Sequence, residues 1–504
     1  MAVKISRSGF IGILALLVML LIVLLFTADN YNSILFSDFI YSCKVCAVVI
    51  TISGVILIIL QNNIFTIANI SYAFFVMFQF GIPFLYAINP DYHNFYTTLF
   101  DEKILNNCVI YTTLCILFWC MGIIVCISNC DSRRYKILFS RFSIMNDAQY
   151  IRHILKYLIV ITGLIVIPLF TYYAFLTLQN GFSQEIRRIL SSNALFRFGN
   201  AFFLPACILY RCYSTRTYWG IIQEIDVPFL YICGASLIIG DRMTGISWLL
   251  VFFYDIYSNY KGKRNKVILD ILLCLGIFLL GTLSAFIAYN RVASTGEQMG
   301  IWEIMKTGVF ARIIEELGFN FYSISFVNLF IPASYDYQYG LSYIYSFLSL
   351  IPSTFDFLGI KQNIVNPTQW LLLANHSEFG SLLDFGTGFS FIAETYMNFS
   401  WLGCAVSFIM PLFLRNIFGP YIISNDWERY VRLIFIFILI TFPRRSLVES
   451  LVVVEYAIFF LGLYLIIMGR ILGRHEKNNR ECKIVCVNRY CMNLLYAPYW
   501  GKQR

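Results

Sequence analysis

An acidic residue interrupts an otherwise apolar stretch, GFSFIAETYMNFSWLG, at residues 388 to 403. A carboxylate facing hydrocarbon costs roughly 2.5 kcal/mol or more, so Glu394 is expected to face a protein interior or a water-filled cavity, where it has a function. On a helix, Ser390, Glu394 and Asn398 follow the i, i+4 spacing and form one polar stripe. The alternative interpretation is a structural glutamate that only bonds a neighbouring helix.

A set of arginines is the second group with chemical potential. Arginine presents a planar fork of donors that binds phosphate oxygens bidentately, so several arginines converging at one membrane face would clamp a diphosphate. The alternative is that each reaches lipid headgroups or pairs with a nearby acid such as Glu449. The clamp hypothesis requires at least two of Arg242, Arg291, Arg444 and Arg445 to converge. The candidates are Arg242, Arg291, Arg312, Arg444 and Arg445.

The elements that must position these residues are transmembrane helices. The 504-residue chain is 59% hydrophobic and only 13% charged, which excludes a soluble protein of this length. We therefore predict an all-α bundle with about 12 spans of roughly 20 residues each. The predicted spans are 9 to 27, 38 to 60, 64 to 88, 105 to 129, 151 to 177, 195 to 212, 219 to 240, 243 to 259, 267 to 289, 387 to 414, 424 to 442 and 447 to 469.

Lysines and arginines orient the predicted bundle, because positive residues in short loops stay cytoplasmic. With the N-terminus inside, the basic loops near 133 to 141 and 261 to 266 are also inside. The prediction is one transmembrane domain, 1 to 469, with both chain termini cytoplasmic. Residues 290 to 386 form a long outer loop within this domain, and residues 470 to 504 form a basic cytoplasmic tail.

The loop from 290 to 386 is long enough to predict a function, and it mixes aromatic, aliphatic and polar residues. This mixture indicates helices that lie at the membrane interface and cover a cavity. Its tyrosines, which include Tyr339 and Tyr343, have rings of the kind that stack on sugars, although tyrosines are also common at any membrane interface.

Cysteine and histidine give no indication of a metal or a cofactor. None of the 15 cysteines lies between 290 and 386, so no disulfide framework is predicted there. Cys482, Cys486 and Cys491 lack the paired spacing of a zinc site, and the four histidines are scattered along the chain. The net charge of +9 is explained by membrane orientation and lipid headgroups, and no nucleic-acid partner is expected.

Four segments in a fixed order resemble the Wzy-type O-antigen polysaccharide polymerases. They are GDRMTG at 240 to 245, EELG at 315 to 318, YGLSYIYSFLSLIPS at 339 to 353, and GFSFIAETYMNFSWLG. The resemblance covers roughly residues 230 to 415, and the remainder is similar only in hydropathy. Ser400 departs from the family pattern, which usually has glycine after Asn-Phe.

The resemblance implies a GT-C-like glycosyltransferase of the bacterial inner membrane that works at the periplasmic face without a metal. It would transfer the growing glycan from undecaprenyl diphosphate to a new lipid-linked repeat unit. Besides membrane lipids, a chain-length regulator and a flippase are the implied partners. Glu394 is the leading candidate for the catalytic base, and His376 is a second candidate because the related O-antigen ligases use a histidine in this loop. The implied site-lining residues are Glu316, Tyr339, Tyr343, Ser390 and Asn398.

Three other functions are consistent with the same residues. A flippase or another transporter would also need arginines in a central cavity, but transporters usually have internal repeats and none is visible here. An O-antigen ligase would share the fold and the arginines and differ in its acceptor. A non-catalytic assembly or receptor protein is disfavoured by the outer arginines and the Glu394 stripe.

Overall fold

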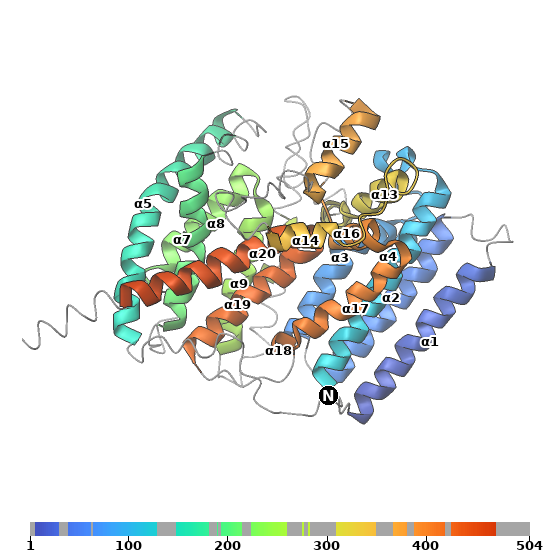
Figure 1. Cartoon of the computed structure of the whole chain (residues 1–504), viewed down its shortest axis with the longest axis horizontal. Coiled ribbons are helices and arrows are strands. Elements are labelled where there is room, and N and C mark those ends of the chain that lie inside the picture. Colours follow the sequence, from blue (N-terminus) through green and yellow to red (C-terminus); the bar gives the residue numbers. More distant parts are fainter. Residues whose placement is uncertain are drawn as a thin grey trace, which may run out of the picture.

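The structure is a computed structural model of the whole chain, and within the residues that it describes every regular element is helical (Figure 1). The described residues are 6–29, 39–61, 64–128, 148–180, 193–213, 223–259, 309–348, 366–380, 388–418 and 425–469, together with 189, 275, 276, 281 and 282. The predicted all-α class agrees with this part of the chain. The predicted tail from 470 to 504 lies outside it.

Two groups of helices stand on either side of a central layer. In Figure 1, α1 to α4 and α17 lie on the right, α5, α7 and α8 lie on the left, and α9, α19 and α20 run between them. The right-hand group comprises α1 (Arg7–Asp29), α2 (Phe39–Gln61), α3 (Ile67–Ile88), η2 (Phe95–Leu99), α4 (Glu102–Ser128) and α17 (Cys404–Phe413). The other helices of these two groups and the layer are α5 (Ala148–Asn180), α7 (Ala194–Tyr213), α8 (Asp226–Ile239), α9 (Arg242–Asn259), α19 (Asp426–Thr441) and α20 (Leu447–Val454).

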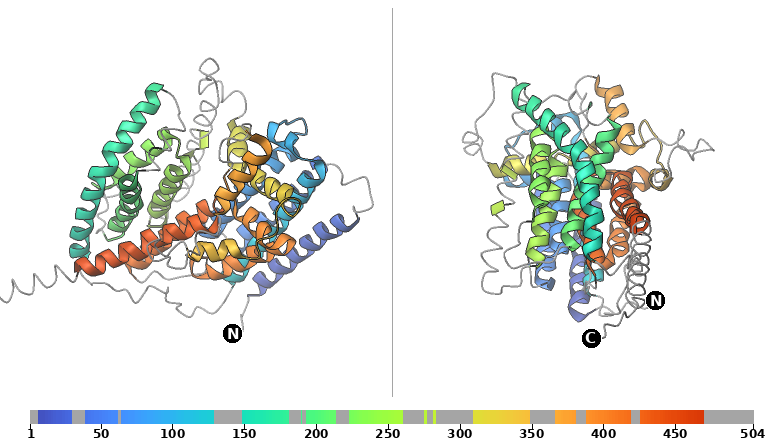
Figure 2. Two further views of the ribbon diagram at one scale, coloured as in Figure 1. Left: turned by 45° about the horizontal axis from the view of Figure 1, so that its top comes forward. Right: turned by 90° about the vertical axis from the view of Figure 1, so that its left-hand side faces the viewer.

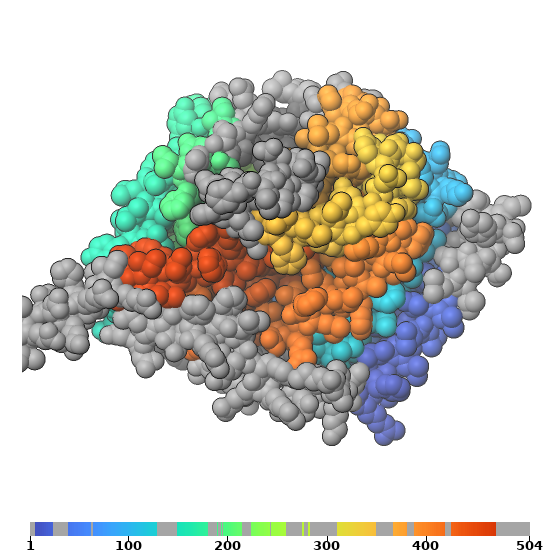
Figure 3. All heavy atoms as spheres, in the orientation of Figure 1, coloured from blue at the N-terminus to red at the C-terminus, as the bar shows by residue number. Residues whose placement is uncertain are grey.

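Short helices pack over one end of this arrangement. Figure 2 shows them in two further orientations, and in the space-filling view the yellow segment lies against the orange surface to which α17 belongs (Figure 3). These short elements are α12 (Val309–Gly318), α13 (Phe321–Phe330), α14 (Leu341–Leu348), α15 (Pro367–Phe379), α16 (Phe391–Phe399) and η7 (Ser400–Gly403). The remaining elements are α18 (Arg415–Phe418), η8 (Phe442–Arg444) and the π-helical stretch η9 (Glu455–Phe460).

Described helix lies within each of the predicted spans, because long apolar runs satisfy their backbone polar groups within the helix. The span predicted at 267 to 289 lies outside the described residues except for 275, 276, 281 and 282, which are helical. Of the described helices, six are long and apolar enough to cross a membrane: 39–61, 67–88, 102–128, 149–179, 391–413 and 447–469. Two shorter apolar helices, 7–23 and 226–239, accompany them. The span predicted at 387 to 414 is interrupted, since α16 ends at Phe399 and η7 separates it from α17.

Glycines allow the closest helix contacts in the bundle. A Cβ on Gly81 of α3 would lie 2.7 Å from the Cα of Gly318 at the end of α12, and one on Gly122 of α4 would lie 2.6 Å from the Phe408 carbonyl oxygen of α17. Small residues of this kind let helix backbones approach one another in membranes, where packing replaces the hydrophobic effect between helices. The Gly81 contact holds α12, and with it the EELG segment, against α3.

Candidate functional site

Glu394 lies in the first turn of α16 and is completely buried. The helix begins there because Ser390 caps it: the Ser390 hydroxyl accepts a hydrogen bond of 3.1 Å from the Ala393 N–H. The same hydroxyl accepts a bond of 2.8 Å from Ser323 of α13. The cap fixes the direction in which α16 enters the protein, and with it the position of Glu394.

The two carboxylate oxygens of Glu394 bind two different elements. Oε1 accepts a hydrogen bond of 2.8 Å from the Ser342 hydroxyl on α14, and Oε2 accepts one of 2.7 Å from the Leu447 backbone N–H at the start of α20. Ser446, the N-cap residue of α20, makes no side-chain capping bond. Glu394 therefore caps α20 from outside that helix, where the helix dipole also favours a negative charge.

Asn398 continues the stripe one turn later. Its Nδ2 donates to the Ser342 hydroxyl at 2.6 Å and to the Glu394 carbonyl at 2.8 Å, while its Oδ1 accepts from the Gly340 N–H at 2.8 Å. The Tyr339 N–H donates to the Asn398 carbonyl at 3.1 Å. The predicted stripe therefore faces the protein interior, and it attaches α14 and the loop before it to α16.

The Glu394 charge is held by neutral donors. Within the described residues no arginine or lysine forms an ion pair with it. Two buried hydroxyls beside it, Tyr343 Oη and Ser446 Oγ, have no hydrogen-bond partner in the described part of the chain. Burial, with a further contribution from the Glu394 carboxylate, raises the pKa of Tyr343 well above its usual range. The phenol thus remains a neutral donor next to a carboxylate.

Arg445 lies two residues before Leu447, whose N–H bonds Glu394. Its Nε is 4.0 Å from Glu449 Oε2, and its guanidinium lies 5.8 Å from the centre of the Phe437 ring. Glu449 also accepts a bond of 3.1 Å from the Thr368 hydroxyl at the start of α15. The pairing of Arg445 with Glu449 is the alternative interpretation considered for this arginine, and it places a cation at the entrance to α20.

Arg444 points elsewhere, into a small cavity of about 20 Å³ that it lines together with Glu316 of α12 and with Met243 and Ser247 of α9. Arg242 is the first residue of α9, immediately before Met243, and its side chain lies outside the described parts. Two elements that carry predicted clamp arginines therefore meet at this cavity. Convergence of the arginine side chains themselves stays a prediction.

The other predicted site residues lie farther out. Arg312 is exposed and bonds Glu315 at 2.8 Å, and His376 and Tyr339 are also exposed. Arg291 lies outside the described residues. In the described part of the chain, no group of three or more His, Cys, Asp or Glu residues could hold a metal ion. The structure thus brings Ser390, Glu394, Asn398 and Tyr343 together, whereas Arg312 and His376 are exposed residues of α12 and α15.

The structure shows what the backbone requires at Ser400, where the chain departs from the family pattern. It ends α16 with φ 52° and ψ −138°, a backbone conformation that suits glycine. Its hydroxyl accepts a bond of 3.1 Å from Tyr337. Gly403 follows on η7, and a Cβ there would lie 2.3 Å from the Thr395 carbonyl oxygen. The turn after α16 is tight, and a glycine at position 400 would fit it without strain.

Sequence reasoning missed a second buried charge centre. It lies at the C-terminal end of α9 and the N-terminal end of α19, away from the ends that line the Arg444 cavity. Arg211 of α7 bonds Asp226 of α8, and its Nε donates to Asp255 of α9 at 2.9 Å. Arg429 of α19 bonds the other Asp255 oxygen through Nε at 3.0 Å. The signal in the sequence is the acidic stretch QEID at 223 to 226, near the start of the span predicted at 219 to 240, because its Asp226 is the residue that pairs with Arg211.

Long apolar helices, a buried carboxylate between them and paired charges at helix ends define a multi-pass helical membrane protein. A profile of the family described as O-antigen polysaccharide polymerase Wzy matches residues 10–475, which is nearly the whole chain. The chain belongs to this family, and the resemblance drawn from four segments is confirmed. Neither the curated proteins nor the solved structures compared with the chain gave a match.

Membership supports a role as an O-antigen polymerase. Wzy polymerases are glycosyltransferases that act on lipid-linked oligosaccharide repeat units in membranes, so the chain is a membrane enzyme of polysaccharide biosynthesis. The family match extends the resemblance, which was limited to residues 230 to 415, across both groups of helices.

Proposed function

We propose that the chain polymerises O-antigen repeat units at the periplasmic face of the bacterial inner membrane. It transfers the growing glycan from undecaprenyl diphosphate to the non-reducing end of a new lipid-linked unit. The family match over residues 10–475 carries this proposal. The proposed architecture is GT-C-like with about 12 spans, cytoplasmic termini, an outer loop at 290 to 386 and a basic tail at 470 to 504.

In the proposed reaction a hydroxyl of the new unit attacks the anomeric carbon of the growing chain. The bond from that carbon to the diphosphate oxygen breaks, the electron pair leaves with the diphosphate, and the hydroxyl proton passes to Glu394. Each carboxylate oxygen of Glu394 already accepts one bond, and each has a second lone pair for the incoming hydroxyl. Tyr343 and Ser446 supply unpaired hydroxyls next to it that can orient a sugar.

The leaving diphosphate needs compensating positive charge, which the outer arginines supply without a divalent metal. Arg444 is the best-supported member of this clamp because it faces a cavity next to the start of α9, where Arg242 is located. Arg445, Arg291 and Arg312 complete the predicted set. Among the remaining candidates, Ser390 and Asn398 hold the helix that carries the base, Glu316 and Tyr339 contact substrate, and His376 is the alternative base.

Reconstitution tests this function directly. Purified protein in proteoliposomes receives undecaprenyl-diphosphate-linked repeat units, with and without a chelator, and the product is sized on a gel. We expect polymer from the protein alone and no effect of the chelator. Products that carry a single transferred unit on a different acceptor would indicate a ligase, and movement of intact substrate across the bilayer without extension would indicate a flippase. A chain-length regulator added afterwards should change the length distribution only.

A further inference from the structure

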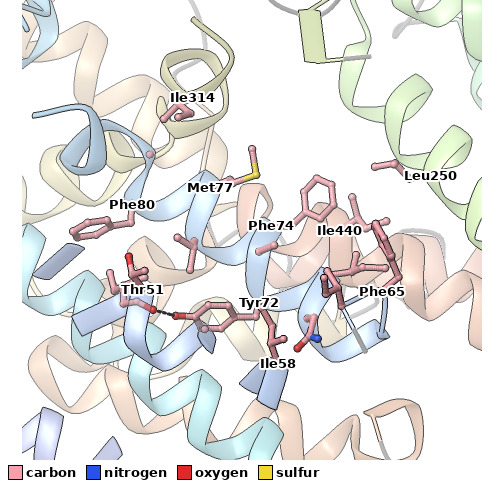
Figure 4. A pocket seen from close by; sticks show the side chains of 18 of the residues that line it. Thr51, Ile58, Phe65, Tyr72, Phe74, Met77, Phe80, Leu250, Ile314 and Ile440 are labelled. Carbon is pink, nitrogen blue, oxygen red and sulfur yellow. Dashed lines mark hydrogen bonds between the residues drawn. The ribbon is translucent and has the colours of Figure 1, made fainter. Parts of the chain in front are cut away.

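A large apolar cavity lies between α2, α3, α9, α12 and α19, and its lining includes exposed side chains such as Val55, Ile64 and Phe310 (Figure 4). Its volume is about 620 Å³, within the usual size range of ligand sites. The wall is almost entirely apolar, and Thr51, Asn69 and three tyrosines are the lining residues that carry polar side-chain atoms. A cavity with this lining suits a hydrocarbon ligand.

The cavity is elongated along α3. Its lining on this helix extends from Asn69 to Phe84, which corresponds to about 22 Å at 1.5 Å per residue. A bilayer's hydrocarbon core is about 30 Å thick, so the cavity covers most of this depth if α3 crosses the membrane. Its shape therefore fits an extended chain better than a compact apolar molecule.

The apolar cavity meets the small cavity that contains Arg444. Phe74 and Ile440 line both cavities, and Figure 4 shows these two side chains next to each other. The two cavities share Phe74, which lies within the stretch Asn69 to Phe84, so a ligand whose polar end lies level with Phe74 and whose chain follows α3 toward Phe84 would have that end next to the cavity of Arg444. The guanidinium of arginine is suited to phosphate oxygens. Glu316, which also lines the small cavity, repels an anion and weakens this contact.

We propose that this cavity binds the hydrocarbon chain of the lipid diphosphate carrier and that Arg444 binds its phosphate. The inference rests on the proposed function for the identity of the lipid, and it assigns the place where that lipid lies. The occupant is a single long-chain lipid diphosphate. Bulk phospholipid is the competing occupant that the experiment must exclude.

Photo-crosslinking in nanodiscs of phosphatidylethanolamine and phosphatidylglycerol tests the assignment. The probe is geranylgeranyl diphosphate with a diazirine on its chain, and labelled peptides are mapped by mass spectrometry. We expect labels on the peptides around Ala73 and Met77, with displacement by unlabelled undecaprenyl diphosphate. Two results would overturn the assignment. One is labelling that phosphatidylglycerol displaces equally well, and the other is labelling that is as strong at Ile59, an exposed residue of α2 that does not line the cavity.

Substitutions in the cavity wall test the lipid assignment independently. Ala73 and Val55 are exposed and line the cavity, so Ala73→Trp or Val55→Trp narrows it without overfilling the packed core. Ile59, 65% exposed and absent from the lining, gives the matched control Ile59→Trp. We expect at least a fivefold loss of labelling in both cavity variants and none in the control. Arg444→Ala should weaken displacement by the diphosphate about tenfold, whereas Glu316→Gln should strengthen it.

The failure of this inference can be told apart from the failure of the proposed function. If the wild-type protein polymerises and Ala73→Trp keeps the same KM for the lipid-linked unit, the cavity is not the lipid site although the function holds. If the cavity is labelled and the protein makes no polymer, the lipid site holds and the proposed function fails. The expected result is polymerisation by wild type with a KM raised at least fivefold in the cavity variants.

Discussion

Among the residues that the structure describes, two regions compensate buried charge in different ways. In the Arg211 centre, formed by Arg211, Asp226, Asp255 and Arg429, two arginines neutralise two aspartates at the ends of four helices. Glu394 has no such cation within the described residues and is held by a hydroxyl and a backbone N–H. A neutralised cluster suits a permanent structural link, whereas a carboxylate with neutral donors retains basicity for chemistry.

The largest expected effect is on chemistry, through Glu394→Gln. The glutamine oxygen can still accept from the Leu447 N–H, and its amide can donate to Ser342, so the cap on α20 is kept. Removing a general base lowers a rate by about 10² to 10⁴. We expect this loss in chain extension, measured with reconstituted protein, while thermal stability changes little. Normal polymer length in this variant would assign Glu394 a purely structural role.

The Arg211 centre should show the opposite pattern. Arg211→Met leaves Asp226 and Asp255 buried without this partner, and breaking a buried pair costs about 3 to 5 kcal/mol. Thermal unfolding followed by tryptophan fluorescence in detergent should show a markedly lower Tm, with unchanged extension activity per folded molecule. Lys156→Met removes an exposed cation from α5 and serves as the control. If Arg211→Met and Lys156→Met were equally stable, the Arg211 centre would not contribute to the stability of the fold.

Ser342→Ala probes how Glu394 is held. The substitution removes a donor to Glu394 and an acceptor for Asn398, and a buried polar group left unsatisfied costs about 1 to 3 kcal/mol. We expect reduced stability and partial activity, because the carboxylate remains and keeps its bond to Leu447. Ser346→Ala, one turn along α14, is the control and should cost less. Activity as low as that of Glu394→Gln would show that Ser342 itself takes part in the reaction.

Local sequence patterns predicted the helices well because apolar runs depend on nearby residues alone. They also placed Ser390, Glu394 and Asn398 correctly on one buried stripe of α16. They could not predict what the stripe binds, since Ser342 and Leu447 are 52 and 53 residues away from Glu394 in sequence. Likewise, Arg211 and Asp255 were visible as charges near helix ends, and only tertiary packing shows that they pair.

Ser400→Gly tests whether the turn that ends α16, the helix that carries Glu394, is strained. Serine at φ 52° and ψ −138° is strained by about 1 to 3 kcal/mol, and glycine removes this cost. The variant loses the bond from Tyr337, which is worth about 1 kcal/mol. The expected net result is a gain in stability of about 1 kcal/mol with activity retained, seen as a small rise in Tm. A loss of stability would mean that the Tyr337 contact outweighs the strain.

Arg312→Ala should have the smallest effect of these changes. Its ion pair with Glu315 is an exposed i, i+3 pair, with side chains 44% and 23% exposed, and such pairs contribute about 0.2 to 1 kcal/mol because solvent screens them. Glu315 also keeps a bond from Asn94 at 3.1 Å. Arg444 faces the cavity beside α9, so Arg444→Ala should raise the KM for the lipid-linked unit far more. A comparable rise in KM for Arg312→Ala would show that Arg312, although exposed, contributes as much to the diphosphate clamp as Arg444 does.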